Sequence, residues 1–163
     1  MHLFFAAMDF LMKHVILLGL LAIFTYADNY TFLVKPYQKE IELEAKIIAE
    51  IAASSLDEPL RLFIPEISKL EKSVYAQYAT LSTTCEDANF IFINKNIDEK
   101  SICHGQNTLY FTNNYRKLLS DERYFGAFFW NKSRPNIVFI QRRLQAHRIH
   151  LPSSFEQFIE SIE

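Results

Sequence analysis

Two cysteines are the residues of this 163-residue chain whose type and spacing suggest the most definite chemistry. Cys85 and Cys103 form no C-x-x-C pair, and two cysteines this far apart do not make a zinc motif. In an oxidising compartment, two thiols in one small domain usually pair. We therefore predict a structural disulfide that closes a loop of about 17 residues and stabilises the fold by about 3 kcal/mol. The alternative is a redox-active pair.

Histidines offer a second set of potential ligands. His147 and His150 are three residues apart, and His104 adjoins Cys103. The pair of histidines spans an expected helix–coil boundary, and no carboxylate accompanies it at ligand spacing. We therefore predict surface histidines, no metal site and no cofactor.

Signatures of catalysis are missing from the sequence. It contains no P-loop, no dinucleotide-binding glycine motif and no nucleophile elbow. Glu86 and Asp87 are adjacent, as are Asp121 and Glu122, so the two carboxylates of each pair point in different directions. The protein is therefore expected not to be an enzyme. Its formal net charge of −2 leaves no strong basic field, so nucleic acid is not an expected partner.

Asparagines follow two strands that the sequence predicts. Asn94 and Asn96 come after one apolar run, and Asn113 and Asn114 come after the next. In open α/β sheets, ligands gather at the carboxyl ends of parallel strands. These four residues are candidate ligand-binding residues, although asparagines are also ordinary loop residues.

Aromatic and basic residues near the C-terminus are candidates for contact with a partner protein. In a predicted β-hairpin, alternation buries either Phe128 with Trp130 or Phe129, and the other side is open to a partner. Arg142 and Arg143 begin a basic segment that is either a solvated helix face or a contact for an acidic partner. Because interfaces favour Trp and Arg, we name Trp130, Arg142 and Arg143 as candidate partner-binding residues.

The N-terminal residues 1–27 have the pattern of a signal peptide. Met12–His14 supplies a positive region, Val15–Phe24 is apolar, and Thr25–Ala27 offers small residues for cleavage. Ten apolar residues are too few to span a bilayer core of about 30 Å. The mature protein is then a single domain, residues 28–163, whose only membrane contact is through the signal peptide. An uncleaved anchor is the alternative, and the true start is either Met1 or Met12.

Hydrophobic spacing predicts a small layered α/β domain with a mostly parallel central sheet flanked by helices, a C-terminal β-hairpin and a terminal helix. The apolar run Phe90–Ile93 lacks alternation, which is typical of a strand buried on both faces. The other expected elements are an irregular lead-in over 28–36, helices over 37–55, 67–78, 115–119 and 142–147, strands over 60–64, 79–84, 109–112, 126–130 and 136–140, and a last helix from Pro152.

The order of these elements resembles the YfiR-like family of small periplasmic proteins. The resemblance depends on Leu60–Ile64 after the first helix, Cys85 before Phe90–Ile93, the hairpin strands Gly126–Trp130 and Asn136–Ile140, and the step Ile149–Ser154. The chain departs from the family where Phe125 replaces a second glycine before the hairpin and where Gln141 replaces an asparagine after the last strand. It also lacks the cysteines of a second disulfide that some members have.

This resemblance implies a regulatory protein without enzymatic activity. Some members of the family bind the periplasmic domain of an inner-membrane diguanylate cyclase and restrain it, which links envelope redox state to cyclic-di-GMP output. We therefore expect a periplasmic regulatory or sensory module that acts by protein–protein contact, and a homodimer is compatible with this role. The alternative is a periplasmic protein that binds a small ligand or a metal.

Overall fold

The computed structural model describes residues 31–94, 97, 103 and 107–162, and of residues 31–37 it describes only the helical backbone. The predicted signal peptide, residues 1–27, lies outside this part, and so does Asn96. The chain divides into two units, Met1–Gln38 and Lys39–Glu163. The first contributes helical residues 31–38, and the second contains the sheet and the other helices.

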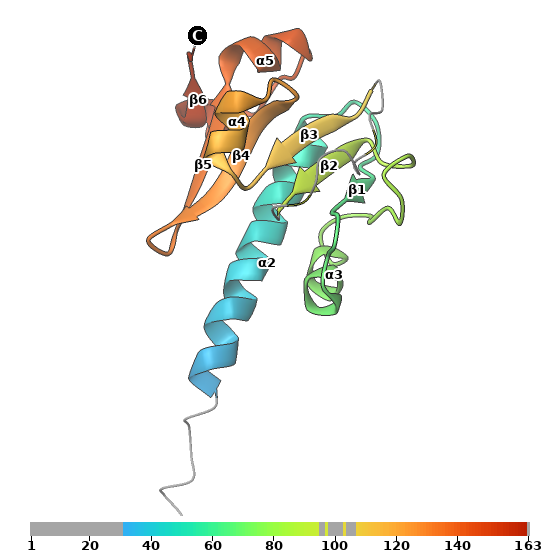
Figure 1. Ribbon diagram of the computed structural model, residues 1–163, viewed down its shortest axis with the longest axis vertical. Coiled ribbons are helices and arrows are strands. Elements are labelled where there is room, and N and C mark those ends of the chain that lie inside the picture. Colours follow the sequence, from blue (N-terminus) through green and yellow to red (C-terminus); the bar gives the residue numbers. More distant parts are fainter. Residues whose placement is uncertain (1–30, 95–96, 98–102, 104–106, 163) are drawn as a thin grey trace, which may run out of the picture. The chain divides into compact units, whose positions relative to one another are not determined.

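The described residues form one six-stranded sheet whose strand order follows the chain (Figure 1). The first four strands are parallel, the fifth is antiparallel to the fourth, and the sixth is parallel to the fifth. The prediction of a mostly parallel α/β sheet with a C-terminal hairpin is confirmed. The strands are β1 (Leu62–Phe63), β2 (Phe90–Ile93), β3 (Leu109–Thr112), β4 (Tyr124–Asn131), β5 (Arg134–Ile140) and β6 (Ile159–Glu160).

Both faces of the sheet are covered. On one face, phenylalanines of the strands pack against the long first helix, the helix after β5 and the C-terminal turn. On the other face, Ile91, Tyr110 and Tyr124 pack with Leu118 of the helix between β3 and β4. All four residues of β2 are buried, as its unbroken apolar run predicts. The helices are α2 (Thr31–Ser54), α3 (Lys69–Tyr75), α4 (Tyr115–Ser120), α5 (Gln141–Ala146) and the 3₁₀ helix η3 (Ser153–Phe158).

Three elements differ from the prediction. Helix α2 begins at Thr31 and not at Tyr37, because the spacing of core residues, which starts at Ile41, carries no information on earlier turns. Residues 79–84 contribute only an isolated bridge, Leu81 to Leu62, and not an edge strand. In place of the predicted terminal helix, the structure has a short 3₁₀ helix followed by β6. Ile159 of β6 pairs with Phe139, so β6 covers the edge of β5 that would otherwise be unpaired.

A β-bulge brings aromatic rings together at Gly126. The register of β4 against β3 shifts here, so Phe125 and Gly126 together lie opposite Phe111. The ring centroids of Phe111 and Phe125 are 5.3 Å apart, and those of Phe111 and Phe139 are 5.9 Å apart. A Cβ atom on Gly126 would lie 2.5 Å from Phe111 and 2.8 Å from Phe139. Glycine is therefore required by the close approach of these rings.

We expect Gly126→Ala to destabilise the protein by about 1–3 kcal/mol, the usual cost of forcing an extra methyl group into a packed core. The added carbon would displace Phe111 and Phe139, which are both fully buried. Urea unfolding of variant and wild type measures the difference, and an unchanged midpoint would show that the rings can move without cost.

Candidate functional site

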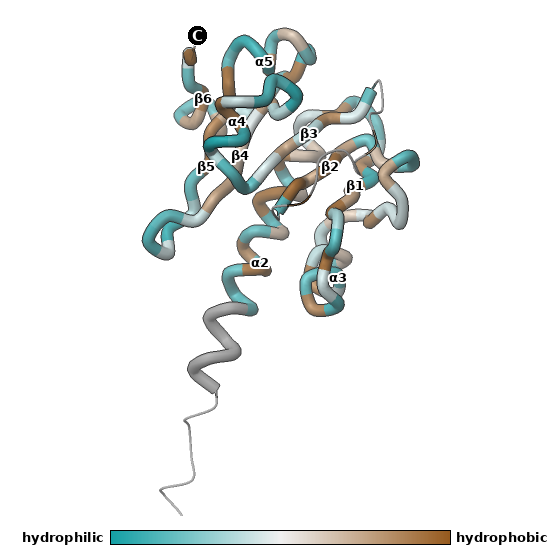
Figure 2. The backbone as a smooth tube through the Cα atoms, viewed as in Figure 1, coloured by the Kyte–Doolittle hydropathy of each residue, from teal (hydrophilic) through white to brown (hydrophobic). Residues whose placement is uncertain are grey.

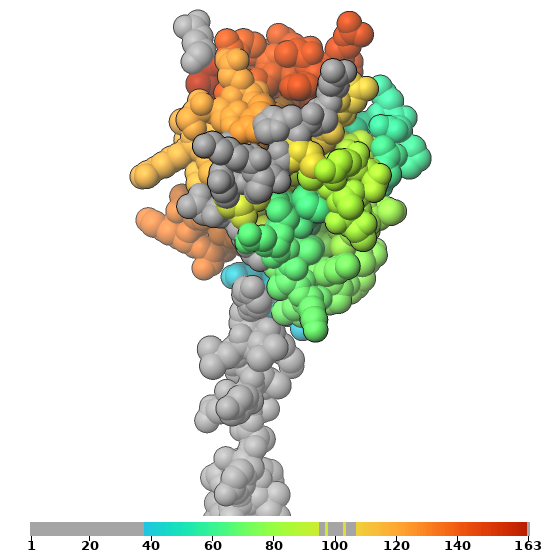
Figure 3. Space-filling view, turned by 45° about the vertical axis from the view of Figure 1, so that its right-hand side comes forward, coloured from blue at the N-terminus to red at the C-terminus, as the bar shows by residue number. Residues whose placement is uncertain are grey.

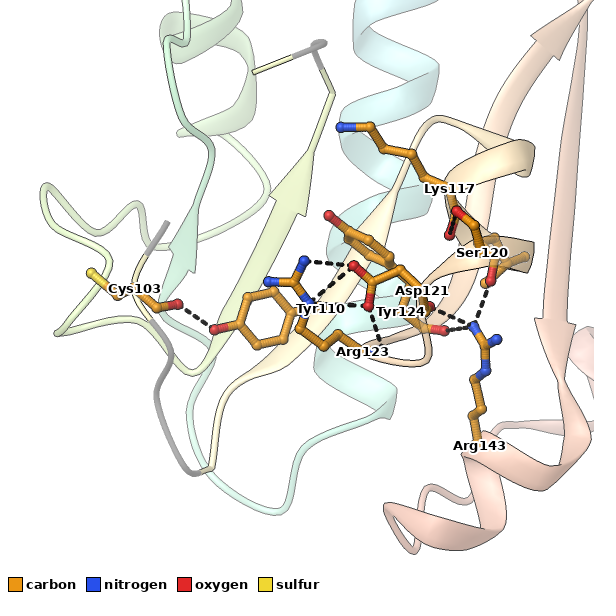
Figure 4. Close-up of polar contacts among 9 residues, drawn as sticks. Cys103, Tyr110, Lys117, Ser120, Asp121, Arg123, Tyr124 and Arg143 are labelled. Atoms are coloured by element: carbon orange, nitrogen blue, oxygen red, sulfur yellow. Dashed lines mark hydrogen bonds and ion pairs between the residues drawn. The ribbon is translucent and has the colours of Figure 1, made fainter. Parts of the chain in front are cut away.

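The disulfide is confirmed. Cys85 and Cys103 are bonded with their Cα atoms 5.7 Å apart, and they join the segments that precede β2 and β3. The hydroxyl of Tyr110 donates a hydrogen bond to the carbonyl oxygen of Cys103 (Figure 4). Ligand atoms of Cys85, Glu86 and Cys103 lie within 4.8 Å of one another. Since the two sulfurs are bonded to each other, neither is a thiolate that could hold a metal ion.

A disulfide of this kind is usual in exported proteins and rare in the cytosol. In the part of the chain that the structure describes, no helix combines the length and apolar character needed to cross a membrane.

The asparagines at the strand ends serve the fold. The side-chain oxygen of Asn114 caps α4 by accepting hydrogen bonds from the backbone of Arg116 at 3.0 Å and of Lys117 at 3.2 Å. The side-chain amide of Asn113 donates to the carbonyl oxygen of Asn94. This contact brings Asn94 and Asn113 together at the carboxyl ends of β2 and β3. The hydrogen bonds of Asn113 and Asn114 also occupy groups that a ligand would need, so ligand binding by these residues stays a prediction.

The end of the β4–β5 hairpin extends beyond the core. Residues 124–128 of β4 are buried, whereas residues 131–135, which we call the hairpin end, are all exposed. The hairpin end is hydrophilic (Figure 2) and stands at the margin of the space-filling view, coloured orange (Figure 3). Lys132 and Ser133 at its turn have positive φ angles of 49° and 59°. This two-residue turn normally takes Gly or Asn, because other residues meet a steric penalty there.

Trp130 is anchored on its inner side. It lies with Phe128 on the sheet face that packs on α2, and the two rings meet edge to face at 5.7 Å. Its indole N–H donates to Glu44 Oε2 at 3.4 Å, and the side chain is half-buried. Phe129 points to the opposite face and contacts Tyr115, with ring centroids 5.6 Å apart. Of the two predicted alternatives, the structure therefore has Phe128 with Trp130 on the main core face.

Glu44 joins three elements beside the hairpin end. Its carboxylate accepts a hydrogen bond from the Tyr75 hydroxyl of α3 at 2.7 Å as well as the bond from Trp130 of β4. Burial raises the pKa of Glu44 above its ordinary value, although these two hydrogen bonds oppose the shift. Burial likewise raises the pKa of Tyr75. No spacing signal in the sequence indicates that Trp130 reaches Glu44, because the two residues are 86 positions apart.

Arg143 is a buried structural residue. Its side chain is only 7% exposed. Its Nη1 atom donates to the carbonyl oxygens of Leu118 and Tyr124, both at 2.6 Å, and of Asp121 at 3.0 Å (Figure 4). Burial lowers the pKa of the guanidinium group. The prediction that Arg143 contacts a partner is therefore wrong, because a helix period from so short a segment does not show which arginine faces inward.

Arg142 does face solvent. Its side chain forms a surface ion pair with Glu122, with 2.6 Å between Nη2 and Oε1. His147 and His150 are also exposed, and they flank Arg148, whose φ of 57° is left-handed. The structure thus separates the basic segment into a buried arginine and an exposed, cationic surface.

Comparisons of the chain with models of known protein families, with curated proteins and with solved structures returned no match. The functional argument therefore depends on the geometry described above.

The raised pKa of Glu44 makes the stability of the fold depend on pH in a definite direction. A raised pKa means that the folded protein holds the proton more tightly than the unfolded chain. The contribution of Glu44 to stability is therefore complete below the ordinary carboxyl pKa and is lost as pH rises through the raised value. Glutamine cannot ionise, so we expect Glu44→Gln to gain stability relative to wild type as pH increases from about 4 to 8.

Thermal or urea unfolding at several pH values tests this expectation. Glu40→Gln, at an exposed position of the same helix, is the control. A stability difference between Glu44→Gln and wild type that stays constant with pH would contradict the assignment.

The adjacent arginines provide a matched pair. Arg143→Ala removes the hydrogen bonds that the buried guanidinium group donates to three carbonyl oxygens near the end of α4, so we expect a loss of more than about 2 kcal/mol in the free energy of unfolding. Arg142→Ala removes only a surface ion pair and should cost less than about 1 kcal/mol. Equal melting temperatures for the two variants would show that Arg143 does not support α4.

Proposed function

We propose that this protein is an exported, non-enzymatic regulatory module that acts by protein–protein contact through its hairpin end, residues 131–135. The observation that carries the proposal is the strained, exposed turn at Lys132 and Ser133. Non-glycine residues with strained backbone conformations are concentrated at functional sites, where the function of the site requires the conformation despite its cost in stability. A turn needed only to reverse the chain would be more stable with Gly or Asn.

Exposed positive charges and nearby aromatic side chains support the hairpin end as a binding surface. Lys132 and Arg134 are exposed, and no acidic residue occurs between Phe129 and Asn136, so the hairpin end suits an acidic partner surface. Just behind it, Phe129 and Trp130 are half-buried on opposite faces of the hairpin. Partly accessible aromatic side chains beside cationic ones are typical of residues that dominate the binding energy of an interface.

Three groups with perturbed pKa values, Glu44, Tyr75 and Arg143, support a role without catalysis, since their side chains are engaged within the fold. Glu44 and Tyr75 bond to each other, and Arg143 donates to backbone carbonyls. A catalytic acid or base needs its perturbed pKa where a substrate can reach it.

The partner that we propose is the periplasmic domain of an inner-membrane signalling protein, such as a diguanylate cyclase that this module restrains. The disulfide supports an oxidising, extracytoplasmic location. The resemblance to YfiR-like proteins, carried by the order of the cysteine, the apolar strand and the hairpin, supports this kind of partner.

Site-specific crosslinking tests the contact. A photoreactive amino acid at Ser133 should capture a membrane-anchored signalling protein in the native envelope, whereas the same group at exposed Lys69 of α3 should not. Lys132→Glu combined with Arg134→Glu should abolish the crosslink from Ser133. If the module restrains a cyclase, this double variant should raise cellular cyclic-di-GMP as much as loss of the gene does.

Lys69→Glu is the matched charge-reversal control, and it should leave both the crosslink and the cyclic-di-GMP level unchanged. Both proteins should melt at the wild-type temperature, because the replaced side chains are exposed. A double variant that crosslinks like wild type would overturn the assignment of the hairpin end.

A further inference from the structure

A pocket of about 450 Å³ lies between α5 and β6, away from the hairpin end. Its size falls within the range of about 300–1,000 Å³ that small-molecule sites occupy. Apolar side chains of Leu144, Ile149 and Ile159 line it, together with polar side chains that include Gln145, Arg148 and His150. Leu144 and Ile149 are buried and belong to the main core, so this part of the lining is held in place by the fold.

The polar part of the lining favours an anion. Arg148 supplies a permanent positive charge, and among the residues that the structure describes no acidic side chain lines the pocket. Arg148 is exposed, so its guanidinium group need not lose its hydration before a ligand arrives. The guanidinium group of arginine binds a carboxylate through two parallel hydrogen bonds, which adds geometric selectivity to the attraction.

The backbone at Arg148 provides an independent observation. Helix α5 ends in a Schellman motif. The backbone N–H of Arg148 donates to the carbonyl oxygen of Gln145 at 3.1 Å, and the backbone N–H of Ile149 donates to the carbonyl oxygen of Leu144 at 2.9 Å. In this arrangement the residue with positive φ is usually glycine, because a Cβ atom is disfavoured there. This chain has an arginine at that position, with φ of 57°, on the rim of a pocket. The arginine therefore carries a backbone cost that glycine would avoid.

We infer that this pocket binds a small organic carboxylate with an aliphatic body. The carboxylate pairs with Arg148, and the aliphatic chain covers Leu144, Ile149 and Ile159. A purely structural explanation of Arg148 is its favourable charge at the C-terminal end of a helix. The two explanations differ, since only the first makes ligand binding depend on this side chain. The inference does not depend on the proposed function, because residues 131–135 do not line the pocket.

Titration of the folded, disulfide-bonded protein with octanoate is the direct test. We expect saturable binding of one octanoate, with NMR shifts concentrated at Leu144, Ile149 and Ile159. Octylamine has the same chain and the opposite charge, and octanol has no charge. Neither should bind in the same range of concentration. Equal binding of octylamine or octanol would overturn the inference, because the pocket would then be only an apolar surface.

A variant of Arg148 separates binding from stability. Arg148→Gly should weaken octanoate binding about tenfold or more, through loss of the charge-assisted pair. It should not lower the melting temperature, since glycine adopts the left-handed conformation freely. Arg148→Lys should retain part of the affinity, and Arg116→Ala, which removes an exposed charge from α4, should retain all of it. Unchanged octanoate affinity in Arg148→Gly would refute the role of Arg148 and with it the inference.

Discussion

The close approach of aromatic rings at Gly126 is the constraint on which the rest of the sheet depends. The bulge in β4 places Phe125 beside Gly126, and the missing Cβ atom leaves room for Phe111 of β3 and Phe139 of β5. These rings join three strands in one buried cluster, which is packed further by Phe155 from the C-terminal turn. The cluster fixes the register of the hairpin, and the register decides which residues extend past the core. The position of the hairpin end is therefore set by packing some distance from it.

Two ionisable side chains at the core are held by neutral partners. Glu44 accepts from a hydroxyl and an indole, and Arg143 donates to carbonyl oxygens. Glu44 links α2 and α3 to β4 beside the hairpin end, and Arg143 links α5 to the end of α4. The two proposed binding surfaces lie next to these links. Surfaces for recognition need such rigid support, because a loosely held contact group loses both affinity and selectivity.

Much of the fold could be predicted from local patterns, whereas the polar contacts could not. Local sequence patterns are enough to predict three features: the buried strand β2, the hairpin and the disulfide. A strand buried on both faces has an unbroken apolar run, a hairpin has turn residues between two apolar runs, and a disulfide needs two cysteines. Glu44 is different, since its partners Tyr75 and Trp130 lie 31 and 86 residues away. Arg142 and Arg143 are chemically alike, and only the position of α4 decides which of them is buried. The sequence gives no indication that Arg148 adopts a left-handed backbone conformation, because glycine, the residue that usually marks this conformation, is absent at that position.

The order of the strands has a consequence for how the chain folds as it emerges. Each strand pairs with the one before it in the sequence, from β1 to β6. When the chain appears progressively from its N-terminus, every new strand therefore meets an edge that is already present, and no strand must wait for a distant later partner. The exposed edge moves along the sheet as the chain grows until β6 reaches β5. A growing sheet of this kind limits the time for which any unpaired apolar strand is open to other chains.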